Sequence, residues 1–126
     1  MAYGSGLMDV VQSSTANTPP QFNDGSGIQV GTLCRAWVMY KGTSTQSIYA
    51  SFNVSSVTYN STGVYTVNFT TALPDNKYAC LVTGSYGSGN NFPALAPTTT
   101  AAQIQAYNTT TGIDLDTPYM SAAFFR

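Results

Sequence analysis

From Ile28 onward the chain alternates short apolar segments with turn residues, a pattern typical of an all-β domain. Strands are expected at residues 33–40, at 47–52, in two arms of 54–70, and at 77–83, 102–107 and 119–125. Residues 99–106 offer the one helical alternative, which their threonine-rich flank weakens. We therefore predict a small antiparallel β-sandwich of about six or seven strands with an extended N-terminal arm.

The segment 33–40 is apolar on both faces. Ala36, Val38 and Tyr40 alternate with Trp37 and Met39, so the pattern predicts a central strand that is covered on both sides.

The segment 54–70 has the pattern of a β-hairpin. Tyr65, Val67 and Phe69 share one face of its second arm, and β-branched and aromatic residues dominate both arms. The loop at residues 60–63 ends in Gly63, which we expect to supply the positive φ that such turns need.

Residues 1–24 form a separate polar segment with two prolines near its end. We interpret it as an arm that precedes a sandwich domain at residues 25–126. Its small apolar patch is expected to dock on its own domain or on a neighbouring subunit. The patch consists of Leu7, Met8, Val10 and Val11.

The composition excludes several classes of function. Only 7% of the 126 residues are charged, against about 25% in ordinary soluble domains. Without histidine, Ser-His-Asp and Cys-His nucleophiles are excluded, and two cysteines do not make a usual structural zinc site. Four scattered basic residues are too few for nucleic-acid binding, and no apolar stretch is long enough for a membrane helix. We expect no enzyme, no metal and no cofactor.

Three aspartates near glycines are candidate chemical groups. Asp24 lies in FNDGSG, and Asp114 and Asp116 lie in GIDLD. A calcium loop needs more oxygen ligands at close spacing than either segment supplies, and paired carboxylates also serve in glycoside hydrolysis. We interpret both segments as an ordinary turn and a solvated loop.

The glycine-rich connection at residues 84–97 is a candidate recognition loop. It carries Tyr86, Asn90, Asn91 and Phe92, and exposed rings and amides suit contact with a sugar or a protein. The alternative is that Phe92 folds back into the core.

Cys34 and Cys80 each lie in a strand-like apolar run. We interpret them as two buried reduced thiols, with a disulfide between them as the alternative.

The chain from Gly31 to Val82 resembles a family of phage virion proteins. GTLCRAWVMYKG and SIYASFNVSSVTYNSTGVYTVNFTTALPDNKYACLV are similar to the repeated core of tail-fibre-type and related appendage proteins of tailed bacteriophages, common in marine cyanophages. The matching words lie at residues 36–42, 50–58, 63–78 and 125–126. Met39 and Tyr40 depart from the family pattern, and residues 84–117 follow none.

This resemblance implies a non-enzymatic, often homotrimeric virion component that touches a host surface glycan or protein. A chain of this size without a shaft or a separate anchor domain is expected to be a tip, a short appendage or a decoration. The resemblance leaves open a capsid decoration or knob protein. A third alternative is a free carbohydrate-binding module or a cryptic glycosidase.

Overall fold

The computed structural model describes residues 21–23, 28–30, 34–43, 45–85 and 90–126. The chain divides into two compact units, Met1–Leu33 and Cys34–Arg126. The boundary after Asp24 that the sequence pattern suggested lies outside the described residues and stays a prediction. In the first unit, β1 (Gln21–Asn23) pairs antiparallel with β2 (Ile28–Val30).

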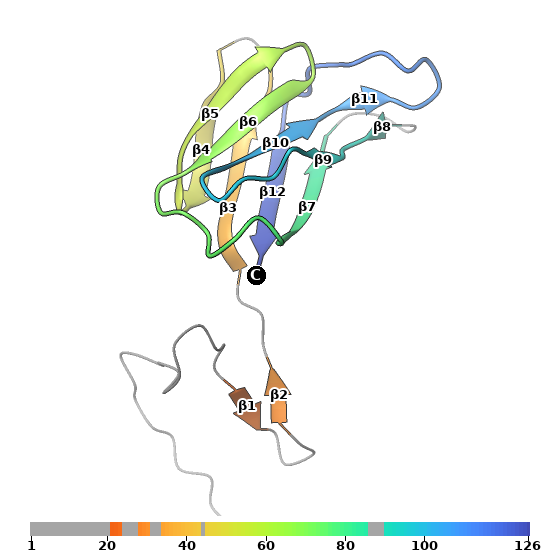
Figure 1. Cartoon of the computed structure of the whole chain (residues 1–126). Coiled ribbons are helices and arrows are strands. Elements are labelled where there is room, and N and C mark those ends of the chain that lie inside the picture. Colours follow the sequence, from red (N-terminus) through yellow and green to blue (C-terminus); the bar gives the residue numbers. More distant parts are fainter. Residues whose placement is uncertain (1–20, 24–27, 31–33, 44, 86–89) are drawn as a thin grey trace, which may run out of the picture. The chain divides into compact units, whose positions relative to one another are not determined.

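The second unit is built from two four-stranded antiparallel sheets, one in front of the other in Figure 1. The described residues contain no helix, which confirms the predicted all-β sandwich. The first sheet has the order β5-β6-β10-β9, made of β5 (Val54–Ser61), β6 (Val64–Phe69), β10 (Ala101–Gln105) and β9 (Ala94–Leu95). The second has the order β4-β3-β12-β7, made of β4 (Ser47–Phe52), β3 (Cys34–Lys41), β12 (Met120–Phe125) and β7 (Ala79–Gly84).

The remaining two strands form a small ribbon beside the sandwich. In it, β8 (Asn90–Asn91) pairs antiparallel with β11 (Tyr107–Asn108). The helical alternative for residues 99–106 is wrong, because β10 occupies most of that stretch and pairs with β6 over five residues.

The core lies between the two sheets and follows the period of two in the sequence. Alternate residues of β6, β3 and β12 point inward, and two rings from different sheets, Phe69 and Phe124, meet edge to face at 5.0 Å. The buried apolar residues are Ala36, Val38, Tyr40, Val54, Tyr65, Val67, Phe69, Leu73, Ala102, Ile104, Ala106, Met120, Ala122 and Phe124.

The predicted hairpin is confirmed. β5 and β6 pair antiparallel, and Gly63 has a φ of 69° in the turn between them. A Cβ atom at this glycine would press on the carbonyl oxygen of Ala106 and lie 2.8 Å from the amide nitrogen of Leu115. Both the backbone conformation and the lack of space therefore require glycine.

The chain passes from one sheet to the other at Asn53, which follows β4 and precedes β5. Asn53 has a φ of 55°, which is uncommon for a residue with a side chain. Its side-chain nitrogen, Nδ2, donates to the carbonyl oxygens of Arg35 and Thr71, and its side-chain oxygen accepts from the backbone amide of Thr71 at 2.7 Å. These three hydrogen bonds stabilise the corner between the sheets.

The prediction that the strand at residues 33–40 is covered on both sides is wrong for the single chain. Strand β3 is central, between β4 and β12. However, Trp37 is 39% exposed and Met39 is 40% exposed, whereas Val38 and Tyr40 on the opposite face are buried. The sandwich has only two layers, so one face of this sheet meets no other layer of the described fold.

Candidate functional site

The uncovered side of the sheet β4-β3-β12-β7 carries several exposed large apolar side chains, and we call it the outer face. The strand registers place Phe52, Trp37, Ala123 and Leu81 in one row across the four strands. Ala50, Met39, Ser121 and Thr83 form the next row. Because partners in antiparallel strands point to the same side, these eight side chains share the outer face.

Four of these side chains carry most of the exposed apolar area. Phe52 is 55% exposed and Leu81 is 65% exposed, beside the partly exposed Trp37 and Met39. Side chains of this size each carry roughly 200 Å², so together the four expose roughly 400 Å². The largest apolar patch of a typical monomer is roughly 300–600 Å² and is often functional.

The outer face contains an open hollow of about 430 Å³. Its lining is small along β12, at residues 121–123, and large on either side, at Trp37 and Met39 of β3 and at Leu81 of β7. A neighbouring hollow of about 230 Å³ shares Thr83 and Ser121 with it and continues to Tyr119. The hydroxyl groups of serine and threonine are the only side-chain polar groups in the lining of the first hollow apart from the indole N–H.

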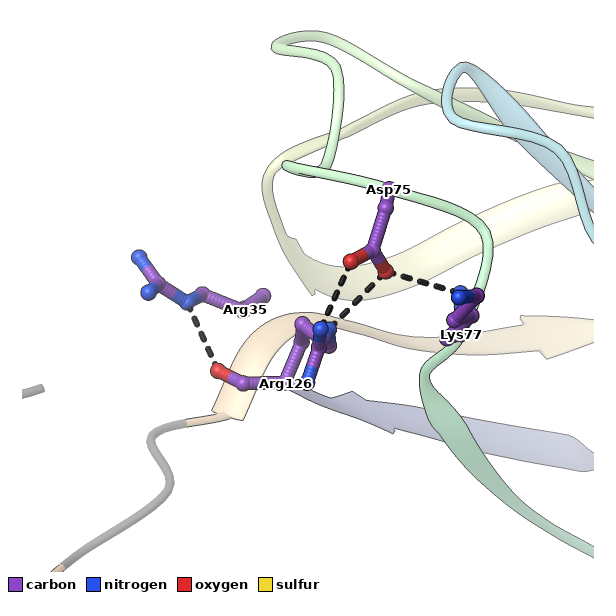
Figure 2. A network of polar contacts seen from close by, with 4 residues as sticks. All are labelled: Arg35, Asp75, Lys77 and Arg126. Carbon is purple, nitrogen blue, oxygen red and sulfur yellow. Dashed lines mark hydrogen bonds and ion pairs between the residues drawn. The ribbon is translucent and has the colours of Figure 1, made fainter. Parts of the chain in front are cut away.

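None of the residues in the two rows of the outer face is charged, and several of the chain's charges are paired elsewhere. Figure 2 shows the main group, at the end of the sheet where β3 begins and β12 ends. Arg126 donates two hydrogen bonds to the carboxylate of Asp75, at 2.9 and 2.6 Å. The amide of Lys77 donates to the same carboxylate, and Arg35 donates to the carbonyl oxygen of Arg126. The hydrogen bonds from Arg126 lower the pKa of Asp75 to about 2.

The two neighbouring aspartates have structural partners. Oδ1 of Asp116 accepts hydrogen bonds from the Tyr65 hydroxyl and from the Gly63 amide, each at 2.8 Å. Asp114 accepts from the side-chain amide of Gln105 at 2.7 Å. Burial and the hydrogen bond to Asp116 raise the pKa of Tyr65, so it stays a donor. The two carboxylates therefore connect segments of the fold to one another.

The sequence reasoning named both carboxylates but missed Tyr65 as the partner of Asp116. The hydroxyl of this buried ring also lies 2.7 Å from the carbonyl oxygen of Gly42. Tyr65 thus joins β6 to the loop after β3 and to the segment before β12. The sequence did contain a signal for this contact. Tyr65 is the one residue with a polar group on a strand face that is otherwise apolar, and the hydroxyl of a buried tyrosine usually makes a hydrogen bond.

The candidate recognition loop is described only in part. Tyr86 lies outside the described residues. Asn91 donates its amide to the Tyr107 hydroxyl at 3.1 Å, within the ribbon that Asn90 also joins. Phe92 is half-buried and packs against the core, where its ring lies beside Gly84. This is the arrangement that the alternative interpretation of Phe92 expected.

The apolar patch of the arm, Leu7, Met8, Val10 and Val11, lies outside the described residues, as does Asp24 of the FNDGSG segment. Cys34 and Cys80 are both free and half-buried, so the structure has the reduced thiols rather than the disulfide. Burial raises the pKa of Cys80 to about 12.

Within the described ranges, no helix is long and apolar enough to cross a membrane, and no three His, Cys, Asp or Glu residues gather as a metal site. No family model, no curated protein and no solved structure matches the chain. The resemblance to phage virion proteins therefore rests on the sequence words alone and stays a prediction.

Proposed function

We propose that this chain is a non-enzymatic structural protein of a bacteriophage virion, a tail-fibre-like appendage that helps the particle attach to its host. The observation that carries the proposal is the run of sequence words at residues 36–42, 50–58 and 63–78. These words coincide with the strands that build the sandwich, from β3 through β6, so the resemblance concerns the folded core rather than a loop.

The chemistry of the described surface is compatible with this role. The residues that the sequence pattern offered for catalysis, Asp114 and Asp116, are occupied by hydrogen bonds to Gln105, Tyr65 and Gly63. The outer face offers a large apolar surface for assembly with other virion proteins. In this proposal the protein resides in the virion, is assembled in the bacterial cytoplasm and works as a homotrimer. Its receptor is a glycan or a protein of the host surface, and nucleic acid and the membrane interior are not partners.

Three measurements with the encoding phage test the proposal. Mass spectrometry of purified virions should detect the chain, and labelled antibodies should place it on the tail by electron microscopy. Purified protein added in excess should slow adsorption of the phage to its host. Absence of the chain from intact particles would refute the proposal.

A capsid decoration protein is the second candidate, and the two uncharged rows of the outer face favour it, because a decoration must cover an apolar surface against the capsid lattice. Copy number separates the two roles. Hundreds of copies per particle place the protein on the head, whereas a few dozen or fewer place it on the tail. Binding on a glycan array without any presence in virions would instead favour a free carbohydrate-binding module.

A further inference from the structure

We infer that copies of this chain associate through their outer faces, so that the sheet β4-β3-β12-β7 of one copy packs against the same sheet of another. The inference rests on the geometry of the outer face and does not require the protein to belong to a virion. The partner is a second copy of the same chain.

The first argument is the size of the uncovered area. The four large side chains expose roughly 400 Å², and the exposed Ala50, Ala79 and Thr83 on the same sheet add to this. Stable interfaces bury roughly 800 Å² on each partner. A contact that covers this four-stranded face from edge to edge is therefore of the right order for a specific complex of two folded copies.

The second argument is charge. In a two-fold contact between identical surfaces, residues near the axis meet their own copies, so a charge there opposes a like charge and destabilises the contact. The two residue rows of the outer face contain no charged side chain. The charged residues of this side of β3 are Arg35 and Lys41, which alternate with the buried residues as Trp37 and Met39 do and lie beyond the two ends of these rows. Self-association through this face therefore carries no electrostatic penalty within these rows.

The third argument is shape. Leu81, on the edge strand β7, is the most exposed large side chain of the face, and it stands beside a hollow whose lining is small along β12, at residues 121–123. In a pair, Leu81 of one copy can enter the hollow of the other, and the reverse contact forms at the same time. Such reciprocal fit is what a contact between identical surfaces requires, and packed sheets interdigitate their side chains in this way.

A glycan fits the face less well than a second copy does. Sugars bind where aromatic rings are accompanied by polar groups that point at their hydroxyls. Along the hollow, Trp37 is the one ring, and the polar side chains beside it are Thr83 and Ser121. No amide or carboxylate side chain lines the hollow.

Trp37 makes the inference testable, because it is the only tryptophan in the chain and it lies on the outer face. The full-length protein is studied from about 1 to 100 µM, the range in which a micromolar complex dissociates. Sedimentation velocity should give a mass that rises from one copy to two, because a reciprocal contact through one face closes with two copies. Over the same range, tryptophan emission should shift to shorter wavelength as Trp37 becomes buried.

The variant Leu81→Arg should weaken association at least tenfold and keep the emission at long wavelength, because it places a charge on each side of the contact. The matched control is Ile113→Arg, at a residue of similar exposure, 66%, in the loop after β11. It should associate like the parent protein. Far-UV circular dichroism verifies that both variants keep the β fold.

Each other outcome overturns the inference. A chain that stays monomeric with long-wavelength emission has an outer face that does not bind its own kind. A monomer with short-wavelength emission covers the face with another segment of itself. Association without an emission shift, or association that survives Leu81→Arg, uses a different surface. A steep loss of association between about 0.05 and 0.5 M NaCl would mean that ion pairs carry it, which contradicts an uncharged contact.

Discussion

Replacing Tyr65 with phenylalanine should destabilise the fold by about 2 kcal/mol, because it removes a buried hydroxyl group whose single proton is shared between two acceptors. It lies 2.7 Å from the carbonyl oxygen of Gly42 and 2.8 Å from Oδ1 of Asp116. Phenylalanine keeps the ring and its edge-to-face contacts with Tyr40 and Tyr59. The substitution therefore isolates the loss of the donor.

The size of this loss depends on the hydrogen bonds that the acceptors retain in the variant. Asp116 retains the Gly63 amide at 2.8 Å and the Tyr59 hydroxyl at 3.3 Å, so its carboxylate stays partly satisfied. Hydrogen bonds to charged groups contribute about 1.5–3 kcal/mol, and an acceptor left buried without its donor costs a similar amount. A loss of about 2 kcal/mol is a large part of the stability of a small domain.

Tyr40→Phe is the matched control. Tyr40 is as fully buried as Tyr65, but its hydroxyl has no hydrogen-bond partner among the described residues. Removing it should leave the free energy of unfolding unchanged or slightly higher. Tyr78→Phe should fall between the two, at about 1 kcal/mol, because that half-buried hydroxyl shares its one proton between two neutral acceptors, the carbonyl oxygens of Thr98 and Ala101.

Urea unfolding followed by circular dichroism measures all three variants, with each midpoint and slope converted to a free energy. Combining Tyr65→Phe with Asp116→Asn should give less than the sum of the two single effects, since the residues share one interaction. If Tyr65→Phe cost no more than Tyr40→Phe, the proposed role of the hydroxyl in joining three segments would be refuted.

Three further predictions follow from single contacts. Gly63→Ala should lower the free energy of unfolding by about 3 kcal/mol or more, because a Cβ atom there meets backbone atoms. The control Gly112→Ala, at the same φ of 69° but in open space, should lower it by about 1 kcal/mol. Equal losses in urea unfolding would contradict the steric argument. The pKa of Asp75 falls from 3.8 to about 2 on folding, so its contribution to stability is complete above about pH 4 and is lost as the pH falls through 2. Arg126→Gln should therefore make the free energy of unfolding depend less on pH over that range. An unchanged pH dependence would argue against the Arg126–Asp75 pair. Burial raises the pKa of Cys80 to about 12. At pH 8, Cys80 should therefore react with thiol reagents at least about 100-fold more slowly in the folded than in the unfolded protein. Peptide mass spectrometry measures the two rates, and similar rates would contradict the burial of Cys80.

The longer strands were predictable because their signal is local, whereas β8 and β9 lie in the stretch that was interpreted as a glycine-rich connection. In β6, Tyr65, Val67 and Phe69 recur at every second position, and that period indicates an extended chain with one face inward. The turn at Gly63 was predictable for the same reason, since a glycine that closes a short loop between two such arms has a clear conformational role.

The polar contacts of the candidate site were not predictable, because their partners are distant in sequence. Asp114 and Asp116 lie two positions apart, which suggested one shared task. In the folded chain they serve different partners, Gln105 and Tyr65, from different strands. Sequence spacing indicates which side chains point to the same side of a segment, but the topology of the fold determines which residues each of them contacts.

The outer face shows a further limit, because burial depends on what lies across from a strand. Along β3, alternation separates Val38 and Tyr40 from Trp37 and Met39, but both sets are apolar. Sequence alone therefore predicts cover on both sides, whereas one chain supplies cover on one side only. An exposed apolar sheet face of this kind is typical of a surface that becomes buried when a partner binds. If copies of the chain pack through this face, the covered environment that the pattern of β3 predicts belongs to the assembly, and the single chain contains half of it.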